Sequence, residues 1–221
     1  MTDQMRHFDP ADAPAGIQHL LNGIVAPRPI AWVSTWGPDG TANVAPHSYT
    51  TVFNVSPPVI GFVSSGRKDT LNNVEATGAF GCAFTNGALA DAMNLTSADF
   101  PPHVSEFDWA GLTVLPGEVA NAPLVADAPA SFECRVIDIH PVPGTASVLV
   151  LGEVVRVHTA ERIWDGDRID MTAYDPIGRT TGSGYTRIGE QFHMKRPTLQ
   201  GLQEAGAQPA RRADRPAGER S

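Results

Sequence analysis

The sequence predicts a mainly β fold with a few short helices. The chain of 221 residues contains 21 glycines and 19 prolines, so turns are frequent and long helices are not expected. Hydrophobic residues make up 42% and charged residues 18%, which is typical of a globular chain with a buried core. The length fits one domain of ordinary size. Apolar segments with strand composition span residues 30–36, 41–45, 59–63, 79–84, 130–139 and 147–159.

The N-terminal part of the chain predicts a helix followed by a β-hairpin. After a lead-in rich in Pro and Asp, apolar residues recur at helical spacing over residues 17–25. Pro27 and Pro29 end this helix, because proline cannot continue it. The turn-forming residues 37–40 then join two strand segments into a hairpin.

The central part of the chain predicts alternating strands and helices. The strand over residues 59–63 leads through a polar loop into a helix over residues 70–76, which Gly78 ends. Residues 86–98 are expected to be helical. Residues 100–112, which include two consecutive prolines, are expected to form a long surface excursion.

The C-terminal part predicts two long strands, a loop and a tail. The segments 130–139 and 147–159 alternate in the manner of strands, so at least one is expected to be central in a sheet. Residues 175–187, rich in Gly, Thr and Tyr, are expected to form a loop. From Gly201 onward the composition changes and apolar periodicity is absent, which predicts disorder. The expected organisation is a lead-in over residues 1–14, one domain over 15–200 and a disordered tail over 201–221.

Charge and composition argue against several classes of protein. With 16 basic and 24 acidic residues the formal charge is −8, which disfavours sequence-independent binding to nucleic acid. Neither a membrane span nor a secretion signal is expected, so the cytoplasm is the expected location. Cys82 and Cys134 form no C-x-x-C pair and are expected to be buried thiols on strands.

The segment from Ser64 to Asn73 has the residue chemistry of a phosphate site. Small residues, two cations and a hydroxyl residue lie between a predicted strand and a predicted helix start. A helix N-terminus offers unpaired backbone N–H groups to an anion, and Arg67 and Lys68 add positive charge. Ser65 and Thr70 add hydroxyl donors. The alternative is a solvated basic loop in which Asp69 only caps the helix.

Other catalytic motifs are absent from the sequence. It has neither the G-x-G-x-x-G dinucleotide fingerprint nor a G-x-S-x-G nucleophile elbow. The seven histidines lack metal-ligand spacing, so no metal site is expected. His47 is either a contact for substrate or a hydrogen-bonded interior imidazole.

Three ordered blocks of the chain resemble the flavin reductase-like proteins. The blocks are residues 25–35, 43–49 and 67–73. Residues 175–179 with Tyr185 resemble the late P-x-x-R…Y motif of that family more weakly. The chain has Arg-Thr-Thr-Gly at residues 179–182, where the family usually has Arg-Leu-Gly-Gly, so the substrate-side loop departs from the pattern.

The resemblance implies an FMN-binding split β-barrel and a homodimer with two FMN molecules near the subunit interface. It implies that residues of the first two blocks lie along the isoalloxazine, largely through backbone groups and short polar side chains, and that the third block holds the phosphate. The implied cofactor-binding residues are Ser34, Thr35, Asn43, Ala45, Ser48, Ser65, Arg67, Lys68 and Thr70. His47 and Arg179 are candidate contacts for substrate, and no residue is expected to be an obligatory acid or base.

The function that the resemblance implies is reduction of FMN by NADH or NADPH, with the flavin carrying the chemistry. Reduced FMN would then supply a partner monooxygenase. One alternative is an FMN-dependent reductase of another small molecule, such as a nitroaromatic or a quinone. Another is a flavin-binding electron carrier without NAD(P)H activity. The sequence does not distinguish NADH from NADPH, because it contains no assignable motif that reads the ribose.

Overall fold

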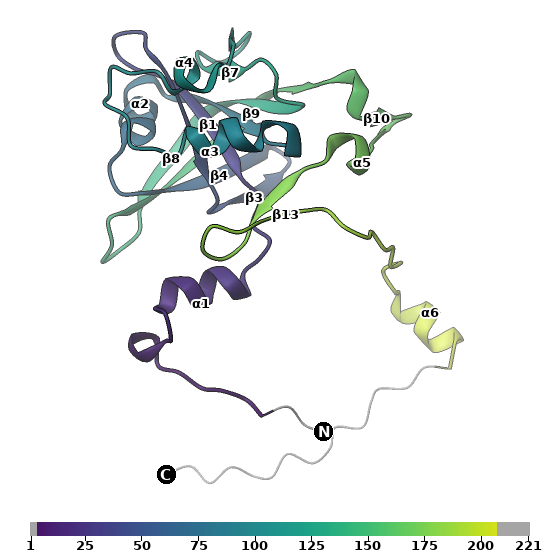
Figure 1. Ribbon diagram of the computed structural model, residues 1–221. Helices are drawn as coiled ribbons and strands as arrows, with labels where there is room; N and C mark the ends of the chain where they lie inside the picture. The colour runs from purple at the N-terminus through teal and green to yellow at the C-terminus, as the bar shows by residue number, and fades with distance from the viewer. Residues whose placement is uncertain (1–3, 207–221) are drawn as a thin grey trace. The chain divides into compact units, whose positions relative to one another are not determined.

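The computed structural model describes residues 4–206, and its main feature is a seven-stranded antiparallel sheet. The strand order is β2-β1-β5-β8-β9-β4-β3 (Figure 1). The strands are β1 (Ala31–Trp36), β2 (Ala42–His47), β3 (Thr50–Val55), β4 (Pro58–Ser65), β5 (Ala79–Phe84), β8 (Ala130–Pro141) and β9 (Ser147–Thr159). The predicted mainly β fold is therefore confirmed, and both long strands are central in the sheet.

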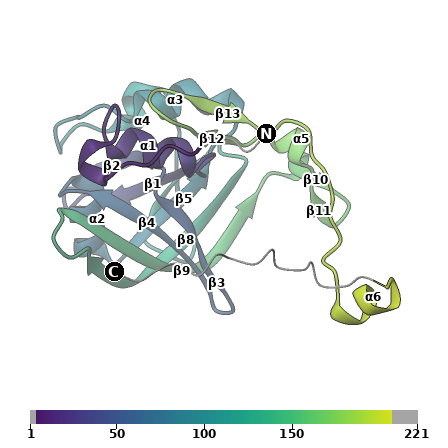
Figure 2. The same ribbon diagram turned by 90° about the horizontal axis from the view of Figure 1, so that it is seen from below.

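The sheet curls because its two edge strands are consecutive in the chain. Only Ser48 and Tyr49 separate β2 from β3, so the opposite edges of the sheet must approach each other. The backbone N–H of Val63 in β4 donates to the carbonyl of Tyr49 at 2.9 Å, which fixes this approach. Register shifts in the β3–β4 and β8–β9 pairs add local twist, as β-bulges do. Figure 2 shows the strands wrapping around a common interior.

Short helices and small strand pairs make up the rest of the described secondary structure. The helices are η1 (Pro10–Asp12), α1 (Ile17–Ile24), α2 (Asp69–Thr77), η2 (Gly87–Leu89), α3 (Ala90–Leu95), α4 (Glu106–Ala110), η3 (Glu161–Ile163), α5 (Met171–Tyr174) and α6 (Leu199–Glu204). The small pairs are β6 (Val114–Pro116) with β7 (Pro123–Val125), β10 (Trp164–Asp165) with β11 (Arg168–Ile169), and β12 (Ile177–Arg179) with β13 (Tyr185–Arg187). In the described part of the chain, no helix is long and apolar enough to span a membrane.

Strand β1 is buried on both faces and joins two hydrophobic clusters. Val33 packs inside the curl with Phe62 and Phe80, whereas Trp32, on the opposite face, packs with Phe107. The indole Nε1 of Trp32 donates to the hydroxyl of Thr96 at 2.9 Å, so its polar atom is satisfied in the interior. Period-two alternation thus places successive β1 side chains in different cores.

The structure corrects two of the sequence-based expectations and adds several strands, of which β3 is the longest. The excursion predicted for residues 100–112 contains α4, whose Phe107 is fully buried. The loop predicted for residues 175–187 contains the β12–β13 pair. Backbone bridges from Arg179 to Arg28 and from Pro176 to Asn86 hold this segment in an extended conformation. Strand β3 was not predicted at all.

The predicted helices over residues 17–25, 70–76 and 86–98 are confirmed with small shifts in their bounds. Cys82 and Cys134 are buried on β5 and β8, as predicted, and burial raises the pKa of Cys82 to about 12. One compact unit of the chain ends at Ile188 and a second begins at Gly189. Within the second unit, α6 covers part of the predicted tail, while residues 207–221 of that tail lie outside the described residues.

Candidate functional site

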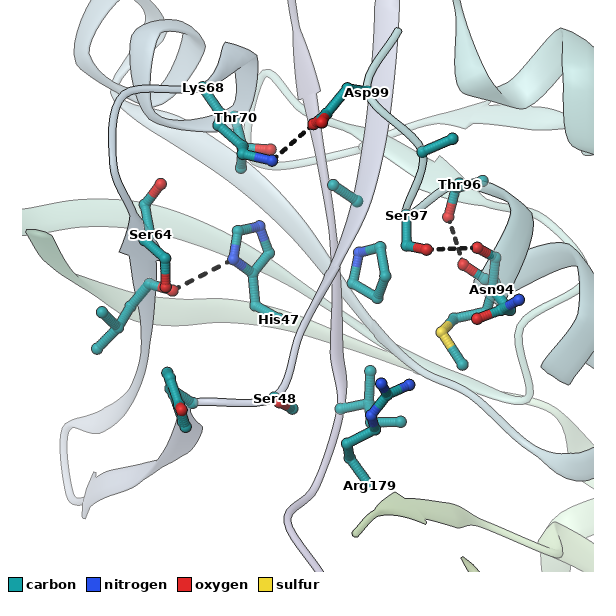
Figure 3. Close-up of a pocket in the computed structure, with 18 of the residues that line it drawn as sticks. His47, Ser48, Ser64, Lys68, Thr70, Asn94, Thr96, Ser97, Asp99 and Arg179 are labelled. Carbon is teal, nitrogen blue, oxygen red and sulfur yellow. Dashed lines mark hydrogen bonds and ion pairs between the residues drawn. The ribbon is translucent and has the colours of Figure 1, made fainter. Parts of the chain in front are cut away.

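A cavity of about 840 Å³ opens beside β2, the start of α2 and the loops after α3 and β12 (Figure 3). Eight of the residues singled out from the sequence line it, seven of them on or directly after β2 or in the segment from β4 to the start of α2. These seven are Asn43, Ala45, His47, Ser48, Ser65, Lys68 and Thr70. Arg179, also singled out, lines it from the end of β12. Ser34, Thr35 and Arg67 do not line it.

The turn between β4 and α2 forms one end of the cavity. Gly66 adopts a φ of +95°, a conformation that favours glycine, and the hydroxyl of Ser64 donates to its carbonyl at 2.8 Å. Lys68 is the N-cap residue of α2, and no side chain in the described part of the chain accepts a hydrogen bond from the N–H groups of the first helical turn. These N–H groups, that of Thr70 among them, provide with the hydroxyl of Ser65 the donors that an anion requires, whereas the hydroxyl of Thr70 donates to Asn43.

The two adjacent cations of this turn point in different directions. The ammonium of Lys68 contacts Asp99 at 2.7 Å, at the mouth of the cavity. The guanidinium of Arg67 pairs with Glu75 of α2 at 2.5 Å and lies outside the cavity lining. The expected phosphate cluster therefore contains one cation from this turn, because successive residues of the extended backbone before the helix project to opposite sides.

A buried hydrogen-bond network joins β1, β2, α2 and α4 behind the cavity wall. Asn43 donates to Glu106 at 2.8 Å, and its amide oxygen accepts from Thr70 at 3.1 Å and from Thr35 at 3.3 Å. Asn73 donates to Thr35 at 3.0 Å. The network fixes the side chains of Asn43, Thr70 and Glu106, the three members that line the cavity.

Glu106 is a cavity residue that the sequence analysis missed. It is 4% exposed, accepts from the backbone N–H of Val44 at 3.1 Å, and has a pKa raised by burial. Local sequence carries no signal for it, since α4 itself was not predicted. Asp99 and Arg28 were missed in the same way, because only the tertiary fold brings them to the cavity.

The hydroxyls of Ser34 and Thr35 form hydrogen bonds inside the protein. Both are buried, and the hydroxyl of Ser34 donates to the carbonyl of Pro123 at 2.5 Å. Thr35 belongs to the network just described. The side chains of both residues therefore face the interior, and neither residue lines the cavity.

His47 lines the cavity and has an unpaired ring nitrogen. Its Nδ1–H donates to the carbonyl of Val63 at 3.3 Å, which leaves Nε2 as the acceptor of a neutral ring. Burial lowers the pKa of His47 to about 4, and the ring packs on Phe62 at a centroid distance of 4.7 Å. Nε2 is buried and has no hydrogen-bond partner among the described residues. A ligand that donates a hydrogen bond would satisfy it.

Residues 4–206 contain no cluster of three or more His, Cys, Asp or Glu side chains able to hold a metal ion. The donor set of the cavity consists of hydroxyls, amides, backbone N–H groups and single cations. This chemistry suits an organic phosphate rather than a metal.

The curled sheet with its cavity defines a split-barrel protein. Residues 25–170 match the family described as "Flavin reductase like domain", and the chain belongs to that family. The resemblance seen in the sequence is therefore confirmed.

Solved structures agree with this assignment. Nitrilotriacetate monooxygenase component B from Bacillus cereus is 34% identical, with a TM-score of 0.83, over 87% of this chain and 100% of that chain. The 2-nitrobenzoate 2-nitroreductase NbaA from Pseudomonas fluorescens is 29% identical, with a TM-score of 0.75, over 81% and 90%. A structure from Shewanella frigidimarina with a split barrel domain is 20% identical, with a TM-score of 0.79, over 87% and 100%, and supports the fold alone.

Proposed function

We propose that this protein binds FMN in the cavity and reduces it with NADH or NADPH. The observation that carries the proposal is the combination, in a member of the flavin reductase-like family, of a large cavity with an uncapped helix start and Lys68 at one end. The volume of about 840 Å³ lies in the range of ordinary cofactor sites.

The residues of the cavity fit the chemical groups of FMN. Ser65, Lys68 and the backbone N–H of Thr70 supply donors and charge for the phosphate. The unpaired Nε2 of His47 needs a hydrogen-bond donor, and FMN carries an imide N–H and several hydroxyls. Asn43 is held by the network behind it, so its remaining amide hydrogen has a fixed direction.

A bound flavin supplies the hydride chemistry, so the protein needs only to bind and orient the two reactants. Consistent with this, His47 stays neutral near pH 7, because burial lowers its pKa to about 4. The carboxylate of Glu106 is occupied by Asn43 and by the N–H of Val44. His47 is therefore a weak base at this pH, and both oxygens of Glu106 already accept hydrogen bonds.

The proposal is tested by the absorbance of the protein after reconstitution with FMN. We expect a flavin band at about 450 nm, and its loss when NADH or NADPH is added anaerobically. Comparing the two nicotinamides at equal concentration identifies the electron donor. Folded protein that shows no FMN binding by titration calorimetry contradicts the proposal. Protein that binds FMN but is not reduced by either nicotinamide supports an electron carrier instead.

A nitroreductase is the second candidate, favoured by the likeness to a 2-nitrobenzoate 2-nitroreductase. In this case FMN stays bound through many turnovers and a nitroaromatic accepts the electrons. FMN that remains with the protein during gel filtration, together with turnover of a nitroaromatic, favours this candidate. FMN that exchanges freely favours the flavin reductase.

We further propose that the protein is a homodimer and that reduced FMN passes to a separate monooxygenase. The likeness to a protein named as a monooxygenase component supports the second part. Exposed apolar residues on β3 and α1 support the first part.

A further inference from the structure

Arg28 and Arg179 face each other across a backbone bridge at one end of the cavity. The N–H of Arg28 donates to the carbonyl of Arg179 at 2.9 Å, and the N–H of Arg179 donates to the carbonyl of Arg28 at 2.9 Å. Residues opposed in this way in an antiparallel pair project their side chains to the same face, with Cβ atoms about 5 Å apart. Both residues line the cavity. The fold therefore holds two guanidinium groups on one face.

The positive charge of this pair is not compensated by the protein. Arg28 is 6% exposed and donates to the backbone carbonyls of Asn22, Val25 and Thr180, at 2.8, 2.8 and 2.9 Å. Within residues 4–206, neither arginine forms an ion pair with a carboxylate. Like charges directly opposed in a strand pair are destabilising, and a buried cation without a counter-ion is costly.

Arg179 retains free donors toward the cavity. Its Nη2 donates to the carbonyl of Gly182 at 2.7 Å, and its guanidinium lies over the ring of Tyr185 at 4.4 Å. Nε and Nη1 donate to no residue in the described part of the chain. Figure 3 shows the guanidinium projecting into the cavity, on the side opposite Lys68. The fixed fork of arginine donors matches the oxygens of a carboxylate or phosphate.

The carboxylates of the cavity lie near its other end. They are Asp69, Asp99 and Glu106. Asp99 contacts Lys68, and Glu106 contacts Asn43. A neighbouring cavity of about 380 Å³ shares Arg179 and includes Asp91, but these two residues form no ion pair. The cavity therefore has a cationic group at each end. Among the described residues, a carboxylate contacts the cation Lys68, whereas no carboxylate contacts Arg28 or Arg179.

We propose that the Arg28–Arg179 end of the cavity is a subsite for an oxyanion carried by the second ligand, the one that exchanges electrons with the flavin. This inference rests on the proposed function. A bound oxyanion compensates the two opposed charges, while the Lys68 end remains for the flavin phosphate. The oxyanion is either the pyrophosphate of a nicotinamide dinucleotide or the carboxylate of an aromatic acceptor.

The test compares Arg179→Gln with the control Arg156→Gln. Arg156 lies on β9, is exposed and pairs with Glu118 at 3.4 Å outside the cavity, so the control makes the same change in net charge. One pair of probes is NADH and N-benzyl-dihydronicotinamide, which has the reacting ring without phosphates. The other pair is benzoate and benzamide, titrated by calorimetry.

In Arg179→Gln we expect the KM for NADH or the Kd for benzoate to rise about tenfold or more, with kcat nearly unchanged. For the neutral probe of the same pair, we expect the KM or Kd to change less than about threefold. In Arg156→Gln, we expect the values for the charged and the neutral probe to stay the same as in the wild type. The pair that responds identifies the source of the oxyanion. Arg179→Lys, which keeps the charge, recovers part of the loss.

The subsite is contradicted if Arg179→Gln weakens the binding of charged and neutral probes equally, or if it weakens the binding of neither probe. A selective loss of FMN over riboflavin in Arg179→Gln also contradicts it, because the arginines then read the flavin phosphate. Wild-type protein that fails to bind FMN contradicts the proposed function instead. In that case the benzoate–benzamide pair, titrated into protein without flavin, still decides whether the subsite exists.

Discussion

Lys68 is the residue that we expect to distinguish FMN from riboflavin. Its ammonium reaches the cavity beside the uncapped start of α2, where a charge-assisted contact with phosphate contributes about 1.5–3 kcal/mol. Lys68→Ala should therefore weaken FMN binding about tenfold to a hundredfold. Riboflavin has the same ring without the phosphate, so its binding should change little. Titration calorimetry with both flavins measures the difference.

Arg67→Ala is the matched control for this prediction. The sequence alone predicted that Arg67 would also hold the phosphate, but its guanidinium pairs with Glu75 outside the cavity lining. We expect Arg67→Ala to change FMN binding by less than about threefold, in line with the small contribution of exposed ion pairs. Equal losses of FMN and riboflavin in Lys68→Ala would show that the turn does not read phosphate.

Asp99 competes with a phosphate for the ammonium of Lys68. The Asp99–Lys68 contact is 2.7 Å, and the hydrogen bond and charge of Lys68 lower the pKa of Asp99, so the carboxylate stays ionised near pH 7. Asp99→Asn should tighten FMN binding about threefold without affecting riboflavin, since it removes a competing anion. Asp108→Asn, an exposed change on α4 outside the cavity lining, is the control. Weaker FMN binding in Asp99→Asn would contradict this prediction.

At the scale of elements, Glu133 fastens the segment after β6 to the sheet. This fully buried carboxylate on β8 accepts from the backbone N–H groups of Glu118, Val119 and Ala120 at 2.9, 2.7 and 2.6 Å. It also contacts Nε2 of His158 on β9 at 2.8 Å. Burial raises the pKa of Glu133, but these hydrogen bonds outweigh it and lower the pKa to about 2.

The pKa of Glu133 is lower in the folded state than its unfolded value of about 4.5, so ionisation of this carboxylate stabilises the folded state. The stabilisation is complete at pH values above about 4.5 and is lost as the pH falls toward 2. Glu133→Gln should reduce the free energy of unfolding by about 3 kcal/mol at pH 7. The difference from wild type should shrink below about pH 4.5. Urea unfolding at several pH values measures both effects. Glu161→Gln, at an exposed position in η3, should show neither, and a gap independent of pH would refute the assignment.

Elements with strong local patterns could be predicted, and elements that depend on distant partners could not. The strands β8 and β9 alternate over many residues between clear turns, so their sequence alone identifies them. Helix α4 spans only Glu106–Ala110, and its stability depends on burying Phe107 against a distant core. Strand β12 bonds to the segment around Arg28, which no local pattern reveals.

The same distinction applies to the site. The Ser64–Asn73 segment was identified because turn, charge and helix start are consecutive in the sequence. The different directions of Arg67 and Lys68 depend on Glu75 and Asp99, and Asp99 lies on a separate loop. The interior position of Ser34 likewise depends on its contact with Pro123. Composition identifies candidate ligands, but their orientation is a tertiary property.

At the scale of the whole molecule, apolar residues of an edge strand remain exposed. Val52, Phe53 and Val55 of β3 are 59%, 50% and 81% exposed, and β3 forms one edge of the seven-stranded sheet. Helix α1, which lines the cavity, has no buried residue, and its Ile24 is 70% exposed. An uncovered apolar edge strand is prone to pair with another chain, so this surface requires cover.

We therefore expect light scattering to give twice the chain mass of 23.5 kDa. Val55→Lys introduces a charge into the apolar surface of β3 and should shift the protein toward monomer at micromolar concentration, because a charge desolvated at an interface is costly. Val157→Lys is the control, since Val157 is also exposed but lies on β9 beyond the residues that pair with β4. A wild-type monomer that binds FMN as tightly at low as at high protein concentration would contradict the dimer. Dissociation of Val157→Lys but not of Val55→Lys would place the interface elsewhere on the sheet.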